Sequence, residues 1–161
     1  MAIVYGFMYI AMEVCFRAAL GRTHDVNAVA YGYASLMGWT SVWMFPIGAL
    51  CGMTLGLIDE LWTATRRAPY YQMRVVLGMI AIYCIEFGSG IVFNLWLGLN
   101  LWSYQDRLNV FGQITLAYLP VWLIMSVFGQ WFDELLRYIF LAKTWPGSFV
   151  LALAEVFGIR N

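Results

Sequence analysis

The chain has 161 residues, of which 63% are hydrophobic, 18% aromatic and only 11% charged, and its mean hydropathy is +0.74. A soluble domain carries about 25% charged residues, so this chain has too few of them to cover a water-facing surface. Nine basic residues balance nine acidic ones, which argues against a nucleic-acid partner. We therefore predict a polytopic membrane protein with one domain over residues 1–161.

Four apolar stretches approach the roughly 20 residues that a helix needs to cross a bilayer. They lie at about 2–20, 42–58, 75–97 and 114–132. The predicted fold is an all-α membrane protein, a bundle of four transmembrane helices. We interpret the first stretch as a retained span and not as a signal peptide, because it lacks a basic N-terminal region and Glu13 and Arg17 interrupt it.

The basic residues of the connecting segments predict the orientation, since cytoplasmic loops carry an excess of them. The second loop and the tail hold six and the first and third loops hold two, namely Arg66, Arg67, Arg74, Arg137, Lys143 and Arg160 against Arg22 and Arg107. We expect a multi-pass integral membrane protein, in the inner membrane if the source is bacterial, with both termini in the cytoplasm.

The second span has a glycine once per turn on a single face, at Gly48, Gly52 and Gly56. Small residues at this spacing let a neighbouring helix approach closely, and packing of this kind drives helix association in lipid. Plain abundance is the competing explanation, because the chain has 15 glycines. The register of the three glycines favours a helix-packing seam.

Glu86 lies at the centre of the third span, where a charged carboxylate costs about 2.5–3.5 kcal/mol on insertion scales. Asn94 follows two turns later and shares its helical face, so we expect this face to point into the protein. In the first span, Glu13 and Arg17 have the spacing at which opposite charges on a helix neutralise each other.

Two interpretations of Glu13, Arg17, Glu86 and Asn94 remain open at this point. They form an intramembrane polar pocket that holds a headgroup, a cation or a proton, or they form a structural clamp that fixes the helix register. In either case Glu86 has no basic partner in its own span, so it shares Arg17 with Glu13 or is protonated.

No pattern in the sequence predicts a catalytic residue, a metal site or a cofactor. His24 is the single histidine and lies in a predicted loop, and the chain has no phosphate-binding loop. The cysteines, Cys15, Cys51 and Cys84, are expected to be small buried hydrophobic residues and not disulfide or zinc partners.

The tail, residues 133–161, begins with apolar side chains at helical spacing, and this pattern predicts an amphipathic helix at the membrane interface. Pro146 and Gly147 end that helix. A second apolar stretch at 149–159 is too short to span and is expected to lie on the surface or against a partner.

A shift of about 74 residues aligns several unusual positions of the chain. Gly38 coincides with Gly112, Pro46 with Pro120, and the run 59–61 with 133–135, whereas Glu13 meets Glu86 with a slip of one residue. This pattern indicates two repeated helical hairpins, as in transporters with parallel repeats. Coincidence is the alternative, because most other positions differ.

Several runs resemble the transmembrane protein 229 family, whose members are also described as ABC-transporter type IV proteins. They are Gly-Trp-Thr-Ser-Val-Trp-Met-Phe-Pro-Ile at 38–47, then Glu86, Leu-Trp-Ser-Tyr at 101–104 and Gly-Gln-Ile-Thr-Leu at 112–116. The resemblance covers roughly 12–130 and implies a small helical membrane protein. The chain departs from the family pattern at 48–49, where members tend to have Tyr-Gly, and at Ser103, where they tend to have an acidic residue.

We expect a non-catalytic integral membrane subunit that packs against partner helices in a larger transport, respiratory or photosynthetic complex. The alternative is a small transporter or a lipid- or small-molecule-binding protein that uses the Glu/Arg/Asn pocket. The expected partners are membrane lipids and other membrane subunits. An intramembrane enzyme ranks last, because two carboxylates and one arginine could support acid–base work but indicate no substrate.

Overall fold

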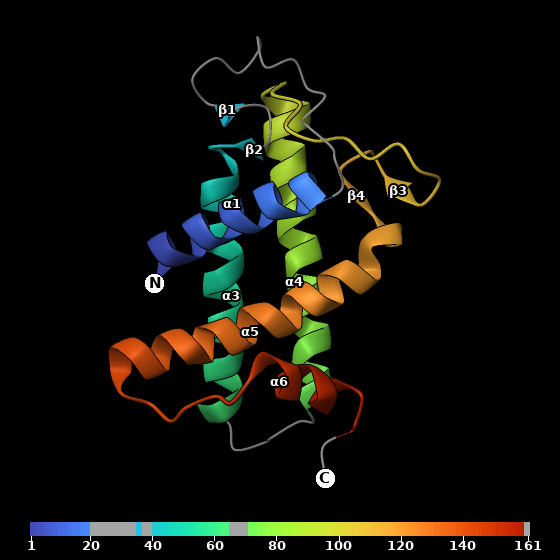
Figure 1. The fold of residues 1–161 in the computed structure, drawn as a ribbon. Helices are drawn as coiled ribbons and strands as arrows, with labels where there is room; N and C mark the ends of the chain where they lie inside the picture. Colours follow the sequence, from blue (N-terminus) through green and yellow to red (C-terminus); the bar gives the residue numbers. More distant parts are fainter. Residues whose placement is uncertain (20–34, 37–39, 65–70, 160–161) are drawn as a thin grey trace. The chain divides into compact units, whose positions relative to one another are not determined.

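The computed structural model describes residues 1–19, 35–36, 40–64 and 71–159, and it is mostly helical (Figure 1). Its helices are α1 (Ala2–Ala19), α3 (Met44–Ala64), α4 (Tyr71–Gly90), α5 (Leu119–Leu141) and α6 (Phe149–Val156). A π-helical segment, η2 (Ile91–Trp96), continues α4. The strands form two short hairpins, β1 (Ser35–Leu36) with β2 (Thr40–Ser41) and β3 (Asn109–Val110) with β4 (Ile114–Thr115), and a 3-10 turn, η3 (Leu116–Tyr118), leads into α5.

Two helical stretches of the described residues have the length and apolar composition needed to cross a membrane. They are Met44–Leu61 of α3, with 18 residues, and Tyr71–Trp96 of α4 and η2, with 26 residues. Helix α1 contributes a shorter apolar stretch, Ala2–Phe16. The predicted helical fold is confirmed, whereas a bundle of four membrane-spanning helices is not shown.

The N-terminal ends of α3 and α5 depend on a proline in the first helical turn. Pro46 and Pro120 occupy these turns, where a backbone N–H has no partner inside the helix, so proline is tolerated. The fourth predicted span began at 114, which was wrong, because 114–118 form β4 and η3. Further inside a helix, Pro120 would clash with the preceding turn.

The C-terminal ends of the same helices also differ from the predicted spans. Helix α3 continues through Asp59 and Glu60 to Ala64, and α5 continues through Asp133 and Glu134 to Leu141. The separate interfacial helix predicted from 133 was wrong, because these residues are the last turns of α5. Arginine side chains bind these carboxylates, so their charges do not end the helices.

The second apolar stretch of the tail folds back onto α5. Ala142 ends α5 in the left-handed region (φ 51°), and the side chain of Ser148 caps α6 by accepting a hydrogen bond from the backbone N–H of Leu151. The ring of Phe149 then packs at 5.6 Å from that of Phe128 and 5.8 Å from that of Trp131, measured between centroids.

The two β-hairpins have the same register at a constant offset along the chain. Ser35 pairs with Ser41, and Asn109 pairs with Thr115, each 74 residues further along. Along the chain, the first hairpin follows α1 and precedes α3, and the second follows α4 and η2 and precedes α5. The order of the described elements therefore repeats at the offset found in the sequence.

The chain forms two compact units. Unit 1 consists of residues 1–51 and 84–117, and unit 2 consists of residues 52–83 and 118–161. The core of unit 1 is Met44, Ile47, Cys51, Leu101 and Trp102, and the core of unit 2 is Leu55, Ile82 and Trp122.

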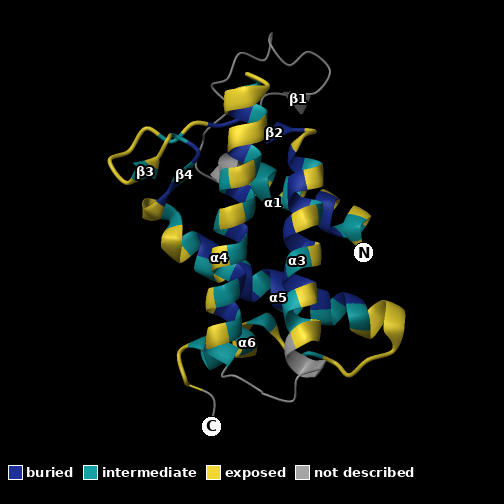
Figure 2. Cartoon of the chain, turned by 180° about the vertical axis from the view of Figure 1, so that it is seen from behind, coloured by how far each residue is buried: buried dark blue, intermediate teal, exposed yellow. Residues whose placement is uncertain are grey.

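Exposed positions recur along the helices α3 and α4 (Figure 2), and many of them carry apolar side chains. On α3 the exposed residues follow helical spacing, at Leu50, Met53, Leu57 and Leu61, and on α4 and η2 they are Met73, Val76, Ile80 and Ile91. Buried polar residues, Glu86 and Asn94 among them, lie elsewhere on α4 and η2. The distribution is the reverse of that on a surface helix of a soluble protein.

We expect Gly78→Ala to destabilise unit 2. A Cβ atom at Gly78 would lie 2.8 Å from Nε2 of Gln130 and overlap the hydroxyl of Ser126, both on α5. Overpacking of this kind costs about 1–3 kcal/mol, more than the helix propensity that alanine contributes. The matched control is Gly88→Ala on the same helix, because a Cβ atom there meets nothing within 4 Å. Thermal unfolding in detergent should show a lower Tm for the first variant and an equal or higher Tm for the second. Equal Tm values would contradict the close helix contact at Gly78.

Candidate functional site

Glu86 is a buried acidic residue of unit 1, and only 7% of its surface is exposed. The phenol of Tyr104 donates a hydrogen bond of 2.8 Å to Oε1 of the carboxyl group. Among the described residues, Oε2 has no hydrogen-bond partner. One half of this carboxyl group is therefore satisfied, and the other half is buried without a donor.

Glu13 of α1 lies close to Glu86, within unit 1. The hydroxyl of Thr40 donates a hydrogen bond to the Glu13 carboxylate, and the two glutamates are near enough for their charges to repel. Tyr9 and Cys51 also interact electrostatically with Glu86. The side chain of Arg17 lies outside the described residues, so its pairing with Glu13 stays a prediction.

Asn94 shares the helix of Glu86 but has its own set of partners. Its Nδ2 donates to the backbone oxygen of Trp102 (3.1 Å) and to Oε1 of Gln113 (2.8 Å), and its Oδ1 accepts from the N–H of Leu101 (2.6 Å). Both ends of the amide are thus satisfied by protein groups. Asn94 anchors the segment after α4, and none of these hydrogen bonds involves Glu86.

The π-helical turns of η2 explain why Asn94 faces inward. In an α-helix each step of four residues advances the side chain by about 40° around the axis, so Asn94, two such steps after Glu86, would share the face of Glu86 only in part. The wider turns of η2 advance less per residue and keep Asn94 buried, at 4% exposure. A π-helical segment of this kind often marks a site that a regular helix could not form.

The segment 97–113 positions Tyr104 for its contact with Glu86. The indole N–H of Trp102 donates to the backbone oxygen of Gln113 (2.8 Å), and the N–H of Tyr104 donates to the oxygen of Gly112 (2.9 Å). The hydroxyl of Thr115, in strand β4 of the hairpin, donates to Oδ1 of Asp106 (2.7 Å), and this hydrogen bond lowers the pKa of Asp106. The sequence drew attention to 101–104 through a family resemblance, and to 112–116 through the same resemblance and the repeat that aligns Gly38 with Gly112.

The three glycines predicted to form a packing seam on α3 are all buried, and two of them lie against a side chain of another helix. A Cβ atom at Gly48 would overlap Tyr9 of α1 in unit 1, and one at Gly56 would lie 2.6 Å from Oδ1 of Asp133 in unit 2. Gly52 between them is buried. The face carries two close contacts with different helices, one in each unit.

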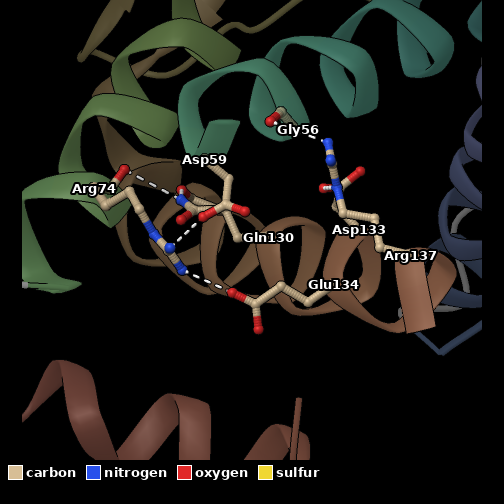
Figure 3. A network of polar contacts seen from close by, with 8 residues as sticks. Gly56, Asp59, Arg74, Gln130, Asp133, Glu134 and Arg137 are labelled. Carbon is tan, nitrogen blue, oxygen red and sulfur yellow. Dashed lines mark hydrogen bonds and ion pairs between the residues drawn. The ribbon is translucent and has the colours of Figure 1, made fainter. Parts of the chain in front are cut away.

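A network of ion pairs in unit 2 was not predicted (Figure 3). Arg74 of α4 binds Asp59 of α3 through Nη1 and Glu134 of α5 through Nη2, the latter at 3.1 Å. The side chain of Arg74 is 16% exposed and that of Asp59 14%. This arginine therefore joins three helices in a largely desolvated position.

Arg137 of α5 forms the second half of the network. It binds Asp133, four residues before it, and Glu60 of α3, and its Nη2 donates to the backbone oxygen of Gly56 at 3.4 Å. Asp133 and Glu60 correspond to Asp59 and Glu134 at the 74-residue offset, with the partners exchanged. The repeated Asp-Glu pairs were the sequence signal for this network, whereas Arg74 and Arg137 had been assigned only to cytoplasmic segments.

Hydroxyl and amide groups of α5 complete the contact with α4 in unit 2. The hydroxyl of Ser126 donates to the backbone oxygen of Val75 (2.8 Å), and Nε2 of Gln130 donates to that of Arg74 (3.1 Å). Both α5 side chains are fully buried. Their spacing of four residues within an apolar stretch was a signal in the sequence, because polar side chains on one face of a span pair with a neighbouring helix.

These polar groups offer limited chemistry. Within the described part of the chain, no group of three or more His, Cys, Asp or Glu side chains could hold a metal ion. All three cysteines are free; Cys51 is buried as expected, but Cys15 and Cys84 are exposed, which corrects the prediction for these two. They lie on outward faces of α1 and α4, where contact with lipid would cover an apolar thiol as well as burial does. His24 lies outside the described residues.

We expect Asn94→Ala to lower the stability of unit 1 by at least about 2 kcal/mol, because it leaves the N–H of Leu101 and the oxygen of Trp102 buried without their partner. Hydrogen exchange at the Leu101 amide should become faster at the same time. The control is Ser89→Ala on α4, since that hydroxyl bonds only to backbone oxygens of its own helix, Ile85 at 2.7 Å and Glu86 at 3.0 Å. Unchanged exchange at Leu101 would show that Asn94 does not hold the segment.

We expect Arg74→Ala to destabilise unit 2 by about 2 kcal/mol, because it leaves partly buried carboxylates without their cation. The double variant Arg74→Leu with Asp59→Asn should recover part of the lost stability, because it replaces both partners of the ion pair by neutral side chains, which cost less to bury than an unpaired charge. Arg107→Ala is the control, as Arg107 is exposed and forms no ion pair among the described residues. Thermal unfolding of the variants tests this expectation, and a double variant no better than Arg74→Ala would contradict it.

Comparison with known proteins adds no assignment to these sites. No protein-family model and no solved structure matches the chain. The resemblance to the transmembrane protein 229 family therefore rests on the sequence runs alone, and the function has to be argued from the residues themselves.

Proposed function

We propose that the chain is an integral membrane protein and that α3 and the helix formed by α4 and η2 cross the bilayer. The observation that carries this proposal is the exposed apolar face of both helices, from Leu50 to Leu61 on α3 and from Met73 to Ile91 on α4 and η2. Soluble proteins rarely expose an apolar surface of this extent. Lipid acyl chains can cover such an apolar face without loss of hydrogen bonds. In a membrane helix polar residues face the protein interior, as the buried Glu86 and Asn94 do.

Within the membrane, we propose that the chain is a non-catalytic subunit that packs against helices of partner proteins. Support comes from the polar groups of the described residues, because most of them bind other groups of the same chain. The surfaces that remain available for contact with a partner are therefore the apolar faces of the helices. The apolar rings and side chains at the end of α5 and in α6, such as Phe140 and Val150, are exposed as well. In this proposal both termini face the cytoplasm, as the basic residues predict.

A second function, transport or the binding of a lipid or small molecule, is favoured by one observation. Glu86 is buried with one oxygen satisfied by Tyr104 and the other without a partner among the described residues. A purely structural residue would normally satisfy both oxygens, as Asn94 does with its amide. In this proposal the Glu13 and Glu86 carboxylates form the site, whereas Asn94 only supports the segment that carries Tyr104.

Site-specific photo-crosslinking in native membranes, followed by purification in mild detergent, distinguishes the two functions. A photo-reactive residue at the exposed position Met53 should capture a stoichiometric partner protein, whereas the same residue at Leu55, which is 3% exposed, should crosslink only within the chain. Both positions lie on α3, so expression and insertion are matched. If Met53 captured only lipid and the chain purified alone, the subunit function would be wrong, and bound lipid or solute in the purified protein would support the second function.

A further inference from the structure

We propose that Glu86 is a proton-binding site, at which the buried carboxyl group holds one exchangeable proton on Oε2 close to the negative charge of Glu13. The inference concerns the chemistry of this residue, and it holds whether the chain is a subunit of a complex or a transporter. The proton comes from solvent and adds to Oε2. The pair of glutamates then changes from two negative charges to one, and no other reactant is consumed.

The geometry of the carboxyl group is the first observation. Oε1 accepts the hydrogen bond of Tyr104 at 2.8 Å, and Oε2 is buried without a donor from any described residue. An ionised carboxylate spreads its charge over both oxygens, so ionisation would place negative charge on an atom that lacks both water and a donor. A neutral carboxylic acid removes that cost, because its proton resides on Oε2.

The surrounding charges are the second observation. The titratable groups facing Glu86 in the described part of unit 1 are Tyr9 and Glu13 from α1, Cys51 from α3 and Tyr104 from the segment after η2. Tyrosine and cysteine side chains carry no positive charge, and the Glu13 carboxylate repels a negative charge on Glu86. None of these groups supplies positive charge, and two carboxylates in one site do not ionise independently.

The same contacts determine how readily the proton leaves. The Tyr104 hydroxyl stabilises the ionised form of Glu86, because its hydrogen bond is stronger to a carboxylate than to a neutral acid. The charge of Glu13 acts in the opposite sense, since repulsion disfavours a second negative charge. The two neighbours therefore give variants whose effects on proton release have opposite signs.

Infrared spectroscopy of the whole protein during a pH titration tests the proposal, because the C=O stretch of a carboxylic acid is separate from the bands of carboxylates. At neutral pH the protein should show this band, and it should disappear as the pH is raised. Glu86→Gln should lack the band, whereas the control Glu155→Gln, which changes a glutamate of α6, should retain it. A wild-type protein without the band, or a band unchanged in Glu86→Gln, would overturn the proposal.

Two further variants connect the band to the proposed geometry. With Tyr104→Phe the band should persist to higher pH than in the wild type, and with Glu13→Gln it should be lost at lower pH. Circular dichroism of each variant checks that its helices are intact. If both variants titrated as the wild type does, the proton would reside on another carboxyl group and the assignment to Glu86 would be wrong.

Discussion

The structure depends on one constraint: polar groups on long apolar helices have to find their partners inside the protein. Helices α3 and α4 expose apolar side chains, and in the proposed membrane setting lipid would cover these faces, so water would not reach the buried polar residues on their other faces. Each unsatisfied buried polar group costs about 1–3 kcal/mol, and a charged group costs more. Unit 1 meets this constraint mainly with hydrogen bonds between neutral groups, and unit 2 meets it mainly with ion pairs.

In unit 1 the partners come from the segment between η2 and α5. Asn94 is satisfied by Leu101, Trp102 and Gln113, and the same segment brings Tyr104 to Glu86. In unit 2 the main polar contacts are ion pairs, in which Arg74 and Arg137 each bind two carboxylates. Four buried side-chain atoms of the described residues lack a hydrogen-bond partner, and Oε2 of Glu86 is the carboxyl oxygen among them, whereas the others belong to Arg74, Trp122 and Gln130. Because a carboxyl group can take up a proton at such an oxygen, Glu86 is the residue to which a chemical role is assigned.

The sequence predicted the helices and the inward face of α4, because apolar length and a lone carboxylate in a span can be read from residue order alone. It did not predict the partners of Glu86 and Asn94, since these come from a segment whose path depends on tertiary contacts. The ends predicted for α3 and α5 also came too early in the chain. Charged residues such as Asp59 and Asp133 are typical of loops, and only the bound arginines make them compatible with the helices.

The central claim is that the apolar faces of α3 and α4 contact lipid while their polar residues face protein. Spin labels placed one at a time along 50–61 of α3, in the protein reconstituted into bilayers, test it through collisions with oxygen, which partitions into lipid, and with a water-soluble nickel complex. The account predicts that oxygen accessibility rises at Leu50, Met53 and Leu57 and falls at Leu55, with little collision with nickel at any of them. High nickel accessibility at Leu50, Met53 and Leu57 would place this face in water and contradict the account.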